Sequence, residues 1–187
     1  MPDPLFVTFS AGRSGAWRIE RVATVIGDGL PMGEALDMIE RPMFPARTDA
    51  IWQLTGVTSN TRYTNRAEVD VLVAAQQGLG RPQATCAALI PIRKSEAWWA
   101  LAQDERRAIF EEQSRHIAIG LDYLPPVARR LHHCRELGEP FDFLTWFEYA
   151  PEHSDAFEDL VLRLRRTPEW RYVTREVDIR LSRRPYP

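Results

Sequence analysis

Residues 141–149 alternate between two kinds of position, and this pattern constrains the fold more than any other stretch of the chain. Successive side chains of a β-strand point to opposite faces of a sheet, so the alternation predicts a strand with two distinct faces. A helix that begins at Ser154 and a strand over residues 171–181 should follow it. One set of positions holds Phe141, Phe143, Thr145, Phe147 and Tyr149, and the other holds Asp142, Leu144, Trp146 and Glu148.

The remaining patterns predict a chain that mixes strands with helices joined by short loops. Such a mixture favours an α+β fold with antiparallel sheets that are flanked by helices. Periodicity and capping residues predict helices over residues 68–79, after Ser95, after Asp104 and from Pro126 to about Leu137, and a short helix near residues 33–40 within a loop. Further strands are predicted over residues 5–9, 16–26, 51–57 and 83–92.

Composition narrows the function classes. Hydrophobic residues make up 44% of the 187 positions, which is enough for a core, and the net charge of -2 gives no basic surface for nucleic acid. The N-terminus lacks a basic segment followed by a long apolar one, and no apolar run approaches the length of a membrane span. Cys86 and Cys134 are expected to be free thiols in a reducing compartment. The sequence therefore predicts a soluble, cytoplasmic protein.

His116 is the leading candidate for chemistry. It lies on the same predicted helix face as Ile109, Gln113 and Gly120, and an inward imidazole on a helix is a common axial ligand of haem iron. Periodicity alone favours an ordinary helix histidine that bonds a backbone carbonyl. His132 and His133 are adjacent, and we expect both to be partly exposed residues of a helix.

The residues around His116 resemble those of the chlorite dismutase family of haem b enzymes. The resemblance rests on residues 90–99, residues 104–110, His116 and Arg129, extends from about residue 60 to 181, and is closest to the short-chain lineage. It implies an α+β fold of two ferredoxin-like halves that form a dimeric α/β barrel. Residues 1–82 would be an abbreviated N-terminal half used for dimerisation, and residues 83–187 would be the haem-binding half.

The resemblance also assigns a site. It implies that His116 binds the iron of haem b, that Glu169 accepts a hydrogen bond from this histidine, and that Arg129 handles an anionic substrate. Glu148 is a weaker alternative for the acceptor, and Gln77 is an alternative to Gln76. The other residues implied to contact the cofactor or line its cavity are Asn60, Tyr63, Gln76, Lys94, Trp98, Trp99, Leu131, Thr145 and Phe147.

The implied activity is that of a chlorite dismutase, which converts chlorite to chloride and dioxygen through an oxo-iron species and hypochlorite. The implied partners are the small chlorite anion and a second copy of the chain in a homodimer, with no nucleic acid and no membrane. The related coproheme decarboxylases carry a reactive tyrosine where this chain has Ile90, and glutamine in place of Arg129. Two alternatives stay open: a peroxidase-like haem oxidoreductase, and a non-catalytic protein that binds or transfers haem.

Overall fold

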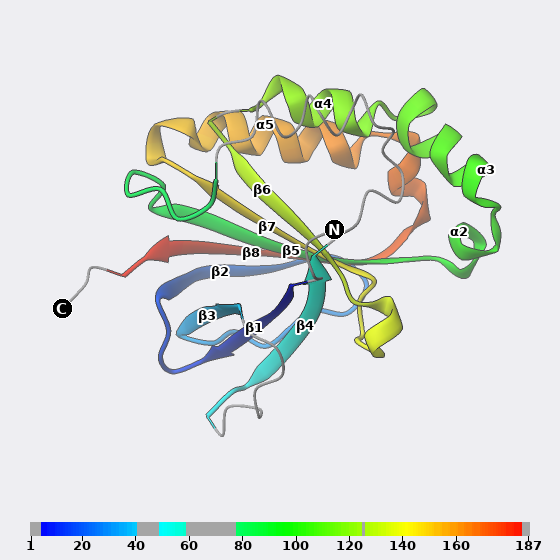
Figure 1. Cartoon of the computed structure of the whole chain (residues 1–187). Coiled ribbons are helices and arrows are strands. Elements are labelled where there is room, and N and C mark those ends of the chain that lie inside the picture. The colour runs from blue at the N-terminus through cyan, green and yellow to red at the C-terminus, as the bar shows by residue number, and fades with distance from the viewer. Residues whose placement is uncertain (1–4, 41–48, 59–77, 125, 185–187) are drawn as a thin grey trace.

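Eight strands close into one antiparallel barrel in the computed structural model, which describes residues 5–40, 49–58, 78–124 and 126–184. The order around the barrel is β1-β3-β2-β8-β5-β7-β6-β4, so β1–β4 form one side and β5–β8 the other (Figure 1). The strands are β1 (Phe6–Gly12), β2 (Trp17–Ile26), β3 (Ala35–Glu40), β4 (Trp52–Thr58), β5 (Cys86–Lys94), β6 (Ala128–His133), β7 (Phe143–Tyr149) and β8 (Val173–Arg183).

The strand pairings around the barrel are unequal in length. β1 pairs with both β3 and β4 over six residues each, whereas β3 meets β2 through two residue pairs. β4 pairs with β6 at Val57 and Thr58, where the described segment ends. The pairing of β3 with β2 is therefore the shortest one that lies wholly within the described residues.

Helices cover the outer face of the β5–β8 side (Figure 1). α4 and α5 lie side by side along this face, while α2 and α3 follow the end of β5. Among the described helices, none combines the length and apolar character that crossing a bilayer requires. The helical elements are α2 (Glu96–Ala100), α3 (Gln103–Arg107), a π-helical turn (Ala108–Gln113), α4 (His116–Asp122), α5 (Ser154–Arg165) and 3-10 turns at Arg135–Leu137, Pro151–His153 and Pro168–Tyr172.

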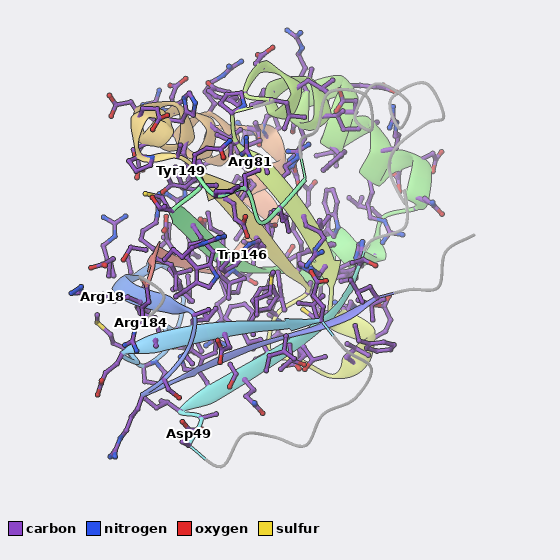
Figure 2. All side chains as sticks on the ribbon, turned by 60° about the vertical axis from the view of Figure 1, so that its left-hand side comes forward. Arg18, Asp49, Arg81, Trp146, Tyr149 and Arg184 are labelled. Carbon is purple, nitrogen blue, oxygen red and sulfur yellow. The ribbon has the colours of Figure 1, made fainter. Side chains whose placement is uncertain are left out.

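The alternation of β7 divides the apolar residues between two cores. Leu144 and Trp146 point into the barrel, and Figure 2 shows Trp146 at its centre. Phe143 and Phe147 point outward into the second core, where Phe147 packs against Phe157 of α5. The predicted strand and its two faces are confirmed over residues 143–149, but Phe141 lies before β7 and packs in the barrel core, not on the face of Phe143. The inward face of the helix is confirmed and consists of Phe157, Leu160, Val161 and Leu164.

Two helix predictions are wrong because strand pairing prevails over local pattern. Residues 35–40 form β3, whose Leu36 and Met38 pack against the barrel interior while the backbone pairs with β1. Residues 128–133 form β6, not part of a helix running to Leu137. The arginines and histidines there made the segment look like an exposed helix face, whereas pairing with β7 sends them alternately to the two faces of the sheet.

The predicted strands near the two termini, at residues 51–57 and within 83–92 are confirmed, as is the helix capped by Ser95, whose hydroxyl accepts the Trp98 N–H. Asp104 is not a cap: α3 begins one residue earlier, and the Ala102 N–H donates to Glu105. The amphipathic segment 68–79 falls almost wholly outside the described residues. Cys86 and Cys134 are free thiols, as expected.

Candidate haem site

His116 begins a new helix and does not continue the preceding one. The chain turns at Arg115, which has the left-handed φ of 52°, so the expected continuous helix from Asp104 through His116 is interrupted. The ring of Phe110, in the π-helical turn, stacks on the imidazole with 4.4 Å between ring centroids. The break thus presents the imidazole at the first residue of α4, held against an aromatic ring.

Glu169 links His116 to Lys94. One carboxylate oxygen accepts from Nδ1 of His116 at 2.7 Å, and the other accepts from the Lys94 amine at 2.6 Å. The Lys94 and Glu169 side chains are almost wholly buried, while that of His116 is one-fifth exposed. The three side chains form a continuous polar chain that ends at the imidazole.

The charge of Glu169 determines which nitrogen of the neutral His116 imidazole carries the proton. Burial raises the pKa of this carboxyl, but the charges and hydrogen bonds of His116 and Lys94 outweigh burial and lower it to about 2. An ionised carboxylate can only accept, so Nδ1 of His116 carries the proton that is shared with it. In the neutral imidazole the lone pair is then on Nε2, which has no hydrogen-bond partner among the described residues and is free to bind a metal.

Trp98 and Trp99 pack differently beside the polar side chains of Lys94, Glu169 and His116. The Trp98 ring is buried and lies 4.5 Å from the Lys94 amine, a cation–π contact. Trp99 stacks on Phe143, and its indole N–H donates to Asp142 at 3.1 Å. The same Asp142 oxygen accepts the backbone N–H of Lys94 at 2.7 Å. Lys94 was expected to contact the cofactor, but its amine pairs with Glu169 instead.

Arg129 lies on a strand and not on a helix, and the strand explains its neighbours. In the register of β6 with β7, Arg129 is opposite Phe147 and Leu131 is opposite Thr145. Paired residues share a face, so all four side chains lie on the outer face of the sheet, beneath the helices. The structure therefore brings together the four residues that were predicted to line one cavity.

The guanidinium of Arg129 lies against Gly120 of α4. A Cβ at Gly120 would be 2.3 Å from Nη1 and 2.6 Å from Cζ of Arg129, so only glycine leaves room for the guanidinium here. Gly120 follows His116 by one helical turn, which puts the cation and the imidazole on the same face of α4. Burial lowers the pKa of Arg129 and the negative charge of Glu111 opposes this, but a guanidinium remains charged.

Substituting Gly120 with alanine should displace the guanidinium without unfolding the protein. The clash is with the end of a flexible side chain, and alanine is the better helix former by about 1 kcal/mol. We expect anions such as fluoride to bind the haem-loaded variant about tenfold more weakly, the loss of roughly one hydrogen bond. Gly78→Ala is the control, because a Cβ there meets no described atom within 4 Å. Equal fluoride affinities in the two variants would contradict the assigned position of Arg129.

Glu148 does not take the alternative role. Its carboxylate accepts the indole N–H of Trp146 at 2.9 Å and the backbone N–H of Gly80 at 2.6 Å, on the side of β7 that faces away from the helices. This alternative is wrong because alternation along β7 sends Glu148 to the other face. Asn60, Tyr63, Gln76 and Gln77 lie outside the described residues, so their expected roles stay predictions.

Several residues that hold the site could not be predicted from the sequence. Ser114 accepts the backbone N–H of Glu169 at 2.9 Å, and Glu111 accepts that of Ile117 at 2.8 Å. Asp142 was assigned only to a strand face. His132 was expected to be partly exposed, but it is fully buried in the barrel, where burial is the main cause that lowers its pKa to about 4. Only a correct strand assignment for residues 128–133 would have revealed this.

Replacing Glu169 with glutamine should raise the reduction potential of bound haem. A neutral amide is a poorer acceptor than a carboxylate, so the histidine donates less electron density to ferric iron. A tenfold change in the relative affinity for the two oxidation states is a shift of about 59 mV, which redox titration resolves. Glu148→Gln makes the same chemical change on the other face of β7 and should leave the potential unchanged. Equal potentials in wild type and Glu169→Gln would remove Glu169 from this role.

The fold and the site together define a class: a closed antiparallel α+β barrel with a histidine–carboxylate–lysine chain and a buried arginine under one helix. A model of the chlorite dismutase family matches residues 31–185. The chain therefore belongs to the chlorite dismutase family.

Individual relatives agree with this assignment. The chlorite dismutase of Ideonella dechloratans is 29% identical over 134 residues, which are 71% of this chain but only 45% of that protein, so the chain spans about half the length of this relative. The dimeric chlorite dismutase of Nitrobacter winogradskyi is 59% identical, with a TM-score of 0.88 over 95% of this chain and 99% of that one. The enzyme from Candidatus Nitrospira defluvii, solved with imidazole, is 21% identical with a TM-score of 0.67 over 95% and 91% of the two chains, a likeness of fold alone.

Proposed function

We propose that this protein is a haem b chlorite dismutase, which converts chlorite to chloride and dioxygen. The observation that carries the proposal is the pair formed by His116 and Glu169, in which the carboxylate holds the proton of Nδ1 and leaves Nε2 available. Membership of the chlorite dismutase family and the likeness to the Nitrobacter winogradskyi enzyme support the choice of substrate.

The residues present fit a haem better than a metal ion bound by protein alone. No cluster of three or more histidine, cysteine, aspartate or glutamate side chains suited to a metal occurs in the part of the chain that the structure describes. A single histidine suffices for iron only when a macrocycle supplies the other ligands. The layer between α4 and the sheet offers apolar side chains such as Ile90 and Phe147, which suit a porphyrin.

Each residue then has a defined task. The haem would supply the redox chemistry when bound. His116 would hold the iron through Nε2, while Glu169 fixes the orientation and electron donation of the imidazole. Arg129 would attract chlorite and retain the hypochlorite anion, because its guanidinium keeps its charge and donates forked hydrogen bonds. Leu131, Thr145 and Phe147 would line the cavity, and Trp98, Trp99, Asn60, Tyr63 and Gln76 would support the cofactor or the arginine.

An oxygen electrode provides the direct test. The haem-loaded protein should release one dioxygen for each chlorite consumed, with chloride as the other product. Turnover of hydrogen peroxide with an organic donor but no dioxygen from chlorite would favour the peroxidase alternative. Absence of both activities, with rapid loss of haem to apomyoglobin, would favour a haem-transfer protein.

We also propose that the chain forms a homodimer through residues 1–82, an abbreviated ferredoxin-like half, with residues 83–187 as the second half. In the loops that precede β3 and β4, Met32 is 59% exposed and Ile51 is 50% exposed, and a second copy of the chain would cover these apolar side chains. Light scattering at micromolar concentration should give twice the chain mass of 21.5 kDa. A mass equal to that of one chain would contradict the proposal.

A further inference from the structure

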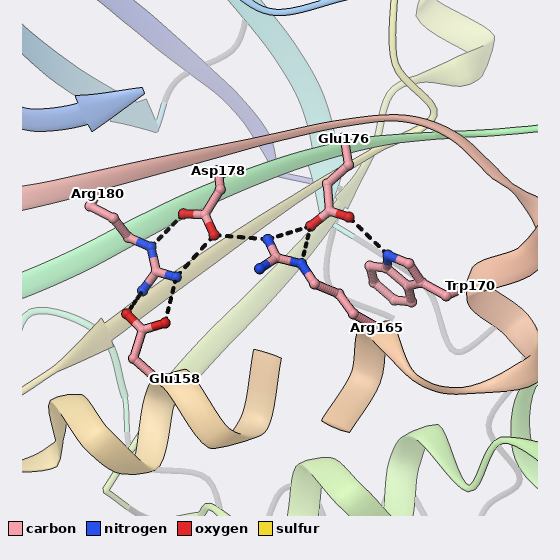
Figure 3. A network of polar contacts seen from close by, with 6 residues as sticks. All are labelled: Glu158, Arg165, Trp170, Glu176, Asp178 and Arg180. Atoms are coloured by element: carbon pink, nitrogen blue, oxygen red, sulfur yellow. Dashed lines mark hydrogen bonds and ion pairs between the residues drawn. The ribbon is translucent and has the colours of Figure 1, made fainter. Parts of the chain in front are cut away.

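A network of charges, exposed at Glu158 and buried at Asp178 and Glu176, runs from α5 along β8 to the turn that carries Glu169 (Figure 3). Glu158 of α5 pairs with both terminal nitrogens of Arg180, at 2.8 and 3.1 Å. Arg180 also pairs with Asp178, and Asp178 accepts from Arg165 at 2.8 Å. The signs of the charges alternate along this network, so each charge has an opposite neighbour.

This network ends at Trp170, the residue that follows Glu169 in the sequence. Arg165 donates from Nε to one oxygen of Glu176 at 2.7 Å, and the indole N–H of Trp170 donates to the other oxygen at 2.8 Å. Glu176 has no exposed surface at all. Trp170 and Glu169 are consecutive residues of the same 3-10 turn, so whatever fixes this indole also fixes the backbone from which the Glu169 carboxylate projects.

Burying these groups is expensive unless every charge is paired. Burial acts against the charged forms of Asp178 and Arg165. The ion pairs with Arg180 and Arg165 nonetheless lower the pKa of Asp178, and the pairs with Glu176 and Asp178 raise the pKa of Arg165. Packed apolar residues would stabilise the same interface at least as well, so a network of this kind is better explained by the geometry it specifies than by stability.

We propose that Trp170, held by Glu176 and Arg165, is a positioning residue for Glu169. A turn of five residues has few internal hydrogen bonds, and Glu169 must direct one oxygen to His116 on α4 and the other to Lys94 on β5. The network anchors the turn to β8, and so holds the Glu169 backbone where one carboxylate oxygen reaches His116 and the other reaches Lys94. This inference rests on the proposed function, in which the Glu169 carboxylate accepts the hydrogen bond of the histidine that would bind haem.

Trp170→Phe tests the proposal, because it keeps an aromatic ring while it deletes the N–H donor. The matched control is Trp146→Phe, which deletes the same kind of bond, from an indole to a buried glutamate, inside the barrel and away from the turn. Hydrogen–deuterium exchange of the purified protein comes first and needs no haem. Trp170→Phe should speed exchange in the Pro168–Tyr172 segment several-fold, and Trp146→Phe should not.

The second measurement is the reduction potential of the haem-loaded protein, with the iron–histidine stretching frequency of the ferrous form. Trp170→Phe should raise the potential and lower the frequency, in the same direction as Glu169→Gln. In the Glu169→Gln background Trp170→Phe should shift neither, because the carboxylate it positions is gone. Glu176→Gln, which retains the shape of the side chain, should behave in the same way if Trp170→Phe folds poorly, apart from a small electrostatic shift that persists in both backgrounds.

The outcomes separate the two proposals. Unchanged exchange in the Pro168–Tyr172 segment overturns the positioning role, whether or not haem binds. Faster exchange with unchanged potential and frequency also overturns it and leaves the network as a purely structural anchor. Failure of the wild-type protein to bind haem overturns the proposed function, and the exchange data alone then decide whether the network holds the turn.

Discussion

His116→Ala should give a folded protein that no longer retains haem. Two of the other histidines are placed differently: His132 is enclosed in the barrel, and His133 packs edge-on against Phe143. Arg129 cannot replace the imidazole as a ligand of iron, because a guanidinium has no acceptor. The measurement is the haem content after gel filtration, by absorbance and by iron analysis. We expect loss of all stoichiometric haem with little loss of stability, since the imidazole is partly exposed.

His153→Ala is the matched control, because His153 lies in the turn before α5 and should not affect haem binding. Adding free imidazole to His116→Ala should restore a five-coordinate spectrum if the cavity stays open. A variant that keeps a normal haem spectrum without added imidazole would sink the assignment of His116 as the ligand, and with it the proposed function.

Arg129→Ala should bind haem and still consume chlorite, but it should become inactive after far fewer turnovers than the wild type. The guanidinium is placed to retain hypochlorite, and losing one hydrogen bond to an anion costs about 2 kcal/mol. Escape of hypochlorite should then be favoured on the order of 30-fold. Escaped hypochlorite oxidises methionine, tryptophan and free cysteine, so the protein inactivates itself.

The measurement is the total dioxygen released per protein before activity ceases, with and without methionine as a trap for hypochlorite. Methionine should prolong the life of Arg129→Ala more than that of wild type. Arg130→Ala is the matched control: Arg130 is the next residue on the strand, but it points to the opposite face and pairs with Glu40. If Arg129→Ala released as much dioxygen as wild type, and the trap changed neither protein, Arg129 would not confine the anion.

The strands and the helix around residues 141–181 could be predicted because their local patterns agree with their tertiary surroundings. β7 alternates because both of its faces are covered by different cores, and α5 buries one stripe against it. β6 could not be predicted, because its polar residues face either the candidate site or the barrel interior, where partners far along the chain satisfy them. His132, for example, bonds the Leu144 carbonyl at 3.0 Å.

The candidate site also contains residues that could be predicted from the sequence and residues that could not. His116, Glu169 and Arg129 were found through a resemblance that extends along the chain. Gly120, Ser114 and Trp170 were not found, because their tasks exist only after the chain has folded: leaving space for a guanidinium, accepting one backbone N–H and anchoring a turn. No spacing between residues in the sequence encodes these contacts.

The short pairing of β3 with β2 has a consequence for local opening of the barrel. Only two residue pairs join these strands, whereas β3 pairs with β1 over six residues and β2 pairs with β8 over eight. Fewer backbone hydrogen bonds must break to separate β3 from β2 than to separate either of the longer pairings, so we expect backbone amides at this edge to exchange with solvent first. β5, from which Lys94 supports Glu169, is held on both edges by long pairings with β7 and β8 and does not border this edge.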